Sequence, residues 1–139
     1  MIDNVHELRP KNADSEKITI NLGYVDLGQV DLLVQDGFYS NRTDLIRTAI
    51  RNQLERHADV VRRSVDRKTL DLGLRHYTKS YLEAARAAGQ TVRINVLGLA
   101  TIADDVSPEL ARATITSVEV LGALHASPGV RAALADRTH

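Results

Sequence analysis

The chain has 139 residues, of which 43% are hydrophobic and 26% charged, and its 18 basic and 18 acidic residues leave no formal net charge. This balance is typical of a soluble globular protein with one ordinary domain or two small ones, and it excludes a disordered chain. The chain has no cysteine, which excludes disulfides, thiolate zinc sites and cysteine nucleophiles. Residues 1–16 show no signal-peptide pattern, and the longest apolar stretch, 96–103, is far shorter than the ~20 residues that span a bilayer. We therefore expect a cytoplasmic protein.

Basic charge is concentrated between Asn41 and Lys68. This stretch holds eight basic residues and four acidic ones. Phosphate groups respond to the local field rather than to the net charge of the whole chain. The concentration is compatible with nucleic-acid binding, but a solvated helix face produces the same pattern, so charge by itself leaves both interpretations open.

The first predicted element is a strand. Residues 1–15 have no periodicity and are expected to form a flexible arm. Residues 17–22 alternate polar and apolar side chains, with β-branched residues among them, and this pattern predicts a half-buried strand that ends at Gly23. A lone strand cannot satisfy its ladder hydrogen bonds, so the same strand of a second copy is its simplest partner.

Two helices are predicted after this strand. The segment 26–29 (Asp-Leu-Gly-Gln) predicts a capping box that begins the first helix, with the aspartate as the cap. Gly37 lies where a left-handed residue ends a helix. Ser40 is predicted to cap the second helix, whose apolar residues recur at helical spacing as far as Leu54, and as far as Val61 if the helix continues.

The ordered set of strand, helix, turn and helix resembles a known family. The segments 17–22 (KITINL) and 37–54 (GFYSNRTDLIRTAIRNQL) look like the ribbon-helix-helix proteins, which include the MetJ, Arc and CopG type repressors. The turn at 37–47 resembles the family's Gly-x-x-Ser-x-Arg-Ser-Glu-Leu-Ile-Arg pattern almost position for position. The resemblance implies an α+β protein in which 16–62 forms an intertwined ribbon-helix-helix dimer. Its two strands would pair as a ribbon that enters the major groove of double-stranded DNA.

The resemblance implies that alternate strand residues have different roles. The residues that would face the helices are Ile18, Ile20 and Leu22, and those that would reach base edges are Lys17, Thr19 and Asn21. Lys17 can donate to guanine O6 and N7, Asn21 can pair with adenine N6 and N7, and Thr19 can contact a thymine methyl group. A polar strand surface that only faces solvent is the alternative, and the turn motif favours DNA reading.

The start of the second helix is predicted to bind phosphate. Its first-turn amides and the helix dipole form an anion site, the Ser40 and Thr43 hydroxyls can add donors, and Arg42 can pair with a phosphate. Arg47 and Arg51 lie four apart on one helix face, where they can reach phosphates or acidic residues of the partner subunit. Phosphate contacts would position the dimer while the ribbon specifies sequence. The candidate phosphate contacts are Ser40, Asn41, Arg42, Thr43 and Arg47.

The C-terminal half, 63–139, is predicted to be a small α/β domain for oligomerisation or effector binding. Its predicted strands are 70–74, 92–102 and 118–124, and its predicted helices are 79–88, one that starts at Ser107-Pro108, and one from Ser127-Pro128 to 135. The tripeptide at 96–98 (Val-Leu-Gly) recurs 24 residues later at 120–122, and 70–73 (Leu-Asp-Leu-Gly) is a looser third copy. This recurrence suggests stacked strand–helix repeats, with an ordinary α/β sandwich as the alternative.

No catalytic, metal or cofactor site is predicted. The five histidines are scattered and no cysteine accompanies them, unlike the clustered His and Cys of the family's nickel-responsive branch. Gly98 and Gly122 lack the multi-glycine spacing of a phosphate loop and are interpreted as strand bends. No pair of acids or Ser-His set indicates an enzyme.

The leading functional hypothesis is a sequence-specific regulator of transcription, a repressor or autoregulator. It would act as a homodimer, and its C-terminal half would join dimers into a higher oligomer. One alternative is an antitoxin with a C-terminal toxin-binding region, although such tails are usually disordered alone. Another alternative is a polymerising structural protein. No membrane partner is expected.

Overall fold

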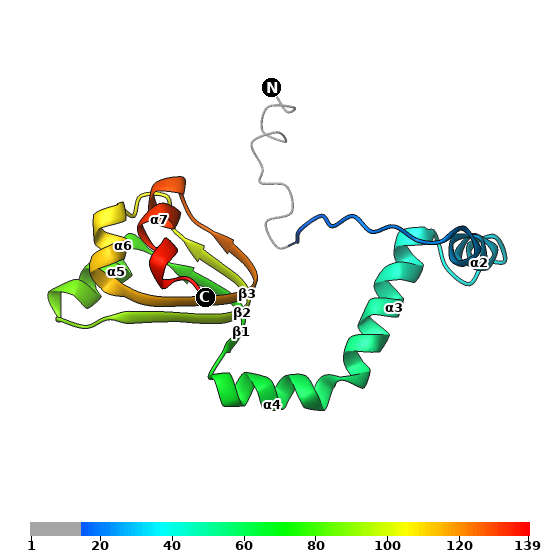
Figure 1. The fold of residues 1–139 in the computed structure, drawn as a ribbon, viewed down its shortest axis with the longest axis horizontal. Coiled ribbons are helices and arrows are strands. Elements are labelled where there is room, and N and C mark those ends of the chain that lie inside the picture. Colours follow the sequence, from blue (N-terminus) through cyan, green and yellow to red (C-terminus); the bar gives the residue numbers. More distant parts are fainter. Residues whose placement is uncertain (1–14) are drawn as a thin grey trace, which may run out of the picture. The chain divides into compact units, whose positions relative to one another are not determined.

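The computed structural model describes residues 15–139 and contains both helices and strands, which confirms the mixed α+β class (Figure 1). The chain divides into two compact units, 1–63 and 64–139, and each is described by itself. Except for Ser15, the predicted arm lies outside the described residues.

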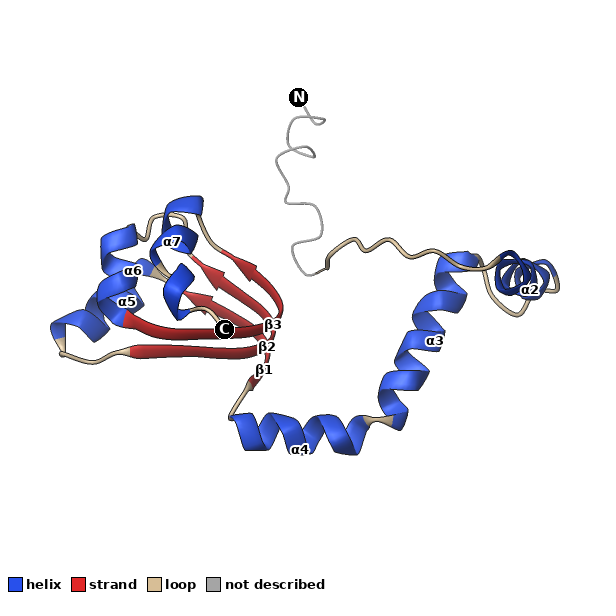
Figure 2. Ribbon diagram, in the orientation of Figure 1, coloured by secondary structure: helices blue, strands red, loops and turns tan. Residues whose placement is uncertain are grey.

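The N-terminal unit contains an extended segment and helices. Residues 15–23 have no assigned secondary structure and are followed by α2 (Tyr24–Gln35) and α3 (Arg42–Arg56) (Figure 2). Helix α4 (Ala58–Lys68) begins after a break at His57 and runs into the second unit. Val61 therefore lies in a separate helix rather than in a continuation of α3.

Helix α2 begins earlier than the sequence predicts. Its N-cap is Gly23, which makes no side-chain capping hydrogen bond, so the capping box at 26–29 is wrong. Asp26 instead lies in the first turn, where its negative charge interacts favourably with the helix dipole. The cap residue was misplaced because an acidic residue is favourable at either position.

The predicted end of α2 is confirmed. Gly37 has a φ of 86°, and its amide donates to the carbonyl of Val34 at 3.1 Å while the amide of Phe38 donates to that of Leu33 at 3.0 Å. These two bonds form a Schellman motif, which satisfies carbonyls at the helix end and requires a left-handed residue.

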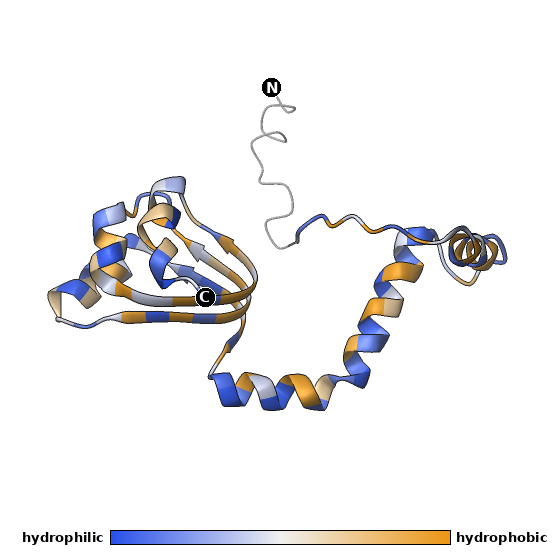
Figure 3. Cartoon of the chain, viewed as in Figure 1, coloured by the Kyte–Doolittle hydropathy of each residue, from blue (hydrophilic) through white to orange (hydrophobic). Residues whose placement is uncertain are grey.

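No residue of 15–63 is buried in the single chain. Figure 3 shows apolar residues along α2 and α3, separated by hydrophilic ones. The exposed large apolar residues of this stretch are Ile18, Ile20, Leu22, Tyr24, Val25, Leu32, Leu33, Phe38, Ile50, Leu54, Val60 and Val61. Folding needs buried apolar surface to offset the loss of conformational entropy. This unit therefore needs a further surface to cover it.

The C-terminal unit alternates strands and helices in the order that the sequence predicts. Its elements are β1 (Asp71–Tyr77), α5 (Lys79–Ala87), β2 (Val92–Ile102), α6 (Pro108–Thr114), β3 (Ile115–His125), α7 (Pro128–Ala133) and a short 3-10 helix (Ala135–Arg137). The three strands form one parallel sheet in the order β1-β2-β3. Each parallel connection contains one helix, as a crossover requires.

The helices of this unit begin at residues that the sequence marks. Ser107 and Ser127 are N-caps, and their hydroxyls accept the amides three residues later at 3.1 and 3.3 Å. A proline follows each serine in the first turn, where its missing N–H costs nothing. Both predicted helix starts are confirmed.

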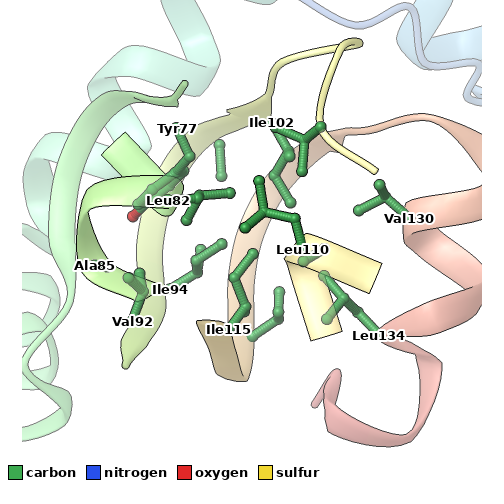
Figure 4. Packing of buried hydrophobic residues seen from close by; sticks show 14 of the residues in the cluster. Tyr77, Leu82, Ala85, Val92, Ile94, Ile102, Leu110, Ile115, Val130 and Leu134 are labelled. Atoms are coloured by element: carbon green, nitrogen blue, oxygen red, sulfur yellow. The ribbon is translucent and has the colours of Figure 1, made fainter. Parts of the chain in front are cut away.

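All three helices pack on one face of the sheet. Their buried residues join those of the strands in one core, with Leu82 of α5, Leu110 of α6 and Val130 of α7 above Ile94 and Ile115 (Figure 4). Gly89, with a φ of 67°, follows the C-cap of α5, which agrees with the predicted helix end at 88. The buried hydroxyl of Thr114 donates to the carbonyl of Leu110 at 2.7 Å, so the one buried polar side chain among the described residues is satisfied.

The sheet register aligns the repeated glycines. Gly73 lies beside Gly98, and Gly98 beside Gly122, each with a φ between 121° and 141°. A Cβ at Gly98 or Gly122 would lie 2.1 Å from the carbonyl oxygen of the glycine on the preceding strand. The repeated tripeptide therefore places a row of glycines across the sheet because neighbouring strands approach too closely there for any side chain.

Candidate nucleic-acid interface

The predicted base-reading residues lie in the extended segment. Lys17, Thr19 and Asn21 are exposed, but so are the apolar residues between them, with Ile18 at 71% and Ile20 at 56%. No strand in 15–139 pairs with this segment, so nothing in one chain assigns its two faces. The predicted pairing with a second copy stays a prediction.

The start of α3 has a different cap from the predicted one. Its N-cap is Asn41, whose side-chain oxygen accepts the amide of Asp44 at 2.8 Å. The Asp44 carboxylate in turn accepts the amide of Ser40 at 3.0 Å. The prediction of Ser40 as the cap is therefore wrong by one residue. Asparagine and serine cap helices about equally well, so propensity did not separate them.

This double capping reduces the predicted anion site. The amides of Ser40 and Asp44 are already bound, and the amides of Arg42 and Thr43 are the first two of the helix, which have no intrahelical acceptor. The Asp44 carboxylate also adds a negative charge beside them. An approaching phosphate would use the Arg42 and Thr43 amides and would face that charge.

Arg42 is held by an acid of the preceding helix. Its guanidinium donates to both carboxylate oxygens of Asp31 on α2, through Nε at 2.7 Å and Nη2 at 2.8 Å. This hydrogen bonding lowers the pKa of Asp31 and raises that of Arg42. Both side chains are about half exposed, at 55% and 50%. The pair links α2 to α3, and because an exposed ion pair is weak, another anion can compete for Arg42.

The other candidate residues are exposed on α3. Thr43 lies in its first turn, and Arg47 and Arg51 lie further along it. The ion pairs of the described N-terminal unit are Arg42–Asp31 and, on α4, Arg62–Asp59. Neither Arg47 nor Arg51 takes part in them.

The family of this chain follows from a comparison with models of protein families. The model of the ribbon-helix-helix transcriptional regulator family matches residues 13–131. The chain belongs to this family. Members of the ribbon-helix-helix family typically bind DNA as dimers. The match extends through most of the second unit, so α5, the sheet and part of α7 lie within the family's pattern. No curated protein and no solved structure matches the chain.

The roles of two acidic residues of this ribbon-helix-helix chain were not predicted from the sequence. Asp44 lies three residues after Asn41, a spacing that resembles a capping box and could have indicated its role. Asp31 is eleven residues before Arg42, and only the packing of two helices brings them together. No local pattern reports that contact.

Other kinds of site have little support in the described chain. No group of three or more metal-ligating side chains lies together in residues 15–139. None of the helices described here combines the length and the apolarity needed to cross a membrane. The C-terminal unit has a hollow of about 340 Å³ beside β1 and α5, lined by residues that include Asp71, Arg75 and Tyr77.

Proposed function

We propose that this protein is a homodimeric, sequence-specific DNA-binding regulator of transcription. The single observation that carries the proposal is the N-terminal unit without a buried residue, in a chain that belongs to the ribbon-helix-helix family. Such a unit gains its core when a second copy covers it.

The extended segment would form the reading element. When two copies pair their residues 17–22 antiparallel, Ile18, Ile20 and Leu22 turn toward the helices, and the other face becomes available to DNA. Lys17, Thr19 and Asn21 on that outer face supply the donors and acceptors that distinguish base pairs in the major groove.

The start of α3 would position the ribbon on the phosphate backbone. The proposed contacts come from Ser40, Asn41, Arg42, Thr43 and Arg47. The Arg42 and Thr43 amides offer unbonded donors, and the Ser40 and Thr43 hydroxyls add to them. Arg42 would exchange Asp31 for a phosphate, or hold α2 in place while its amide binds. Because Asp44 is close by, phosphate binding at this point is expected to be weaker than at an uncharged helix start.

The finer properties belong to the same proposal. We propose a repressor or autoregulator that acts in the cytoplasm, without a cofactor, a metal or an enzymatic activity. Repression would follow from occupying an operator, which needs DNA binding and no chemistry. The C-terminal unit would serve as the oligomerisation or effector domain.

A gel-shift assay tests the proposal. The full chain is incubated with DNA from the region upstream of its own gene, together with excess non-specific competitor. We expect a discrete shift that survives the competitor and is lost in Asn21→Ala. Asn52→Ala, an exposed asparagine of α3 outside the proposed contacts, should leave the shift unchanged. Binding that is indifferent to sequence and abolished by moderate salt would contradict the proposal.

The antitoxin function is the less favoured alternative. A toxin-binding tail that is disordered alone would bury little surface, whereas the C-terminal unit has one continuous core from Tyr77 to Leu134. Limited proteolysis of the protein alone distinguishes the two functions. Rapid trimming of residues after Lys68 would favour the antitoxin.

A further inference from the structure

The parallel sheet of the C-terminal unit has two unequal outer edges. β1 pairs with β2 on one side and has no strand on its other side within the described chain. β3 pairs with β2, and its outer side meets the last residues through a bridge from Val118 to Thr138 and a hydrogen bond from the His139 amide to the Val118 carbonyl at 2.8 Å. The Arg131 guanidinium also donates to the Leu124 carbonyl of β3. Unpaired strand edges attract further strands.

The part of the β3 edge without a neighbouring strand is equivalent, one strand further along the sheet, to the part of β2 that pairs with β1. β1 pairs with β2 from Val96 onward. Val96 pairs with Val120 of β3. A strand that pairs with β3 as β1 pairs with β2 would therefore begin its pairing at Val120. The C-terminal residues reach β3 at Val118, and the Arg131 guanidinium donates to the Leu124 carbonyl, so the open part of the β3 edge is residues 120–123. A strand placed as β1 is placed on β2 would fit beside the C-terminal residues and would replace the Arg131 side chain at the Leu124 carbonyl.

Burial indicates that the β3 edge lacks a neighbour. Val96 and Ala100 of β2 are both 0% exposed, whereas Val120 and Leu124, which pair with them on β3, are only half-buried. Partial burial of apolar side chains next to an open edge leaves apolar surface that another strand would cover.

The outer face carries apolar residues at both edges as well. Leu72 and Leu121 lie in the same row on either side of Leu97, and their exposed fractions are 71% and 47%. Gly73 has the backbone conformation of the other two aligned glycines, but a Cβ there would meet nothing within 4 Å. Gly98 of β2 and Gly122 of β3 each lie close to the preceding strand, whereas no strand of the described chain precedes Gly73 and the surface beside it is open.

We propose that β1 of a second copy adds to the β3 edge in parallel, so that the sheets of successive copies continue head to tail. The partner's Leu72 would lie beside Leu121 and its Gly73 beside Gly122, which repeats the internal register. The interface uses different surfaces on the two copies, so it leaves one edge of each kind unfilled and can propagate. This inference rests on the higher-oligomer part of the proposed function and does not need DNA binding.

Two double variants of the full chain test the arrangement, because both change the same exposed positions and differ only in the sign of one charge. In Leu72→Lys/Leu121→Lys, head-to-tail contact would place like charges side by side. In Leu72→Glu/Leu121→Lys, it would place opposite charges there. Sedimentation velocity across a range of concentrations measures the assembly of each, and circular dichroism checks that both fold.

The expected result is specific to the head-to-tail register. The unmodified chain should grow beyond a dimer as its concentration rises, the Lys/Lys variant should remain at the dimer mass, and the Glu/Lys variant should recover the larger species. Loss of assembly in both variants would overturn the proposal, because antiparallel β1–β1 pairing or packing of two outer sheet faces predicts that outcome. The proposal would also be overturned if both variants formed the larger species, or if the unmodified chain stayed at the dimer mass as its concentration rose.

A glycine variant gives an independent test. Gly73→Ala adds a Cβ that meets nothing in one copy but would meet the Gly122 carbonyl of the preceding copy. Gly89→Ala is the control for a Cβ added at positive φ in open surroundings, although its φ of 67° is less strained for alanine than the 121° of Gly73. We expect both variants to fold, Gly73→Ala to lose more thermal stability than Gly89→Ala, and only Gly73→Ala to lose assembly. Equal assembly of the two would contradict the proposal. A failed gel shift with intact assembly would instead count against DNA binding alone.

Discussion

Ile20→Ala is the most direct perturbation of the proposed ribbon. Full burial of an isoleucine side chain stabilises a protein by about 1.5–3 kcal/mol. Ile20 is 56% exposed in the single chain, so about 1–1.5 kcal/mol of that remains to be gained when a partner covers it. The dimer contains the residue twice, and the variant should lose about 2–3 kcal/mol. The dimer dissociation constant should therefore rise about 30- to 150-fold.

Sedimentation equilibrium measures this constant. The experiment is performed in the Leu72→Lys/Leu121→Lys background, so that association through the C-terminal sheet does not contribute. Thr19→Ala is the matched control, because the proposed ribbon would place its side chain on the opposite face of the strand. It should leave dimerisation unchanged and weaken discrimination at the operator by about 1–3 kcal/mol if the contact is a good one.

The result that would refute this reasoning is the reverse pattern. If Thr19→Ala weakens the dimer and Ile20→Ala does not, the strand register is wrong by one residue, because a single step exchanges the two faces. If neither changes the dimer, the extended segment is not part of the subunit contact.

Three further predictions concern packing and charge. Gly98→Ala should abolish the fold of the C-terminal unit, because the new Cβ would lie 2.1 Å from a backbone oxygen, whereas Gly28→Ala has open space within α2 and should stabilise by about 0.5–1 kcal/mol in thermal melts. Leu82→Ala should lower the free energy of unfolding by about 2–5 kcal/mol in urea titrations, because the side chain is 0% exposed; a loss below about 1 kcal/mol would mean the site collapses. Hydrogen bonding to Arg42 lowers the pKa of Asp31, so this pair stabilises the fold above the ordinary carboxyl pKa and its contribution disappears as the pH falls through the lowered value. Asp31→Asn should be less stable at neutral pH and lose less on acidification, and identical pH profiles would contradict this.

Local sequence patterns determined much of the chain. Serine followed by proline marked the starts of α6 and α7, because an N-cap and a first-turn proline act within four residues. Gly37 marked the end of α2 for the same reason, since its left-handed backbone is a property of one residue. The turn pattern at 37–47 was enough to indicate the family whose model matches residues 13–131.

Local patterns failed where two candidates were equally good or where an element is exposed. Ser40 and Asn41 are both suitable caps, and the hydrogen bonds of Asp44 decided between them. β1 extends past its predicted end at 74 to Tyr77, and β3 begins at Ile115 rather than 118. The missed end of β1 and the missed start of β3 contain polar residues, which hid them from a pattern based on apolar runs. An edge or partly exposed strand does not have to be apolar throughout.

Contacts between distant residues were decided by tertiary structure alone. The sequence contained the 24-residue recurrence, but only the parallel register brought Gly73, Gly98 and Gly122 into one row where a side chain cannot fit. Likewise, only the packing of α2 on α3 joined Arg42 to Asp31. The amino-acid sequence fixes short-range geometry through propensities and hydrogen bonds within a few residues. Which surfaces meet depends on the free energy of burying them together, and that is a property of the folded chain.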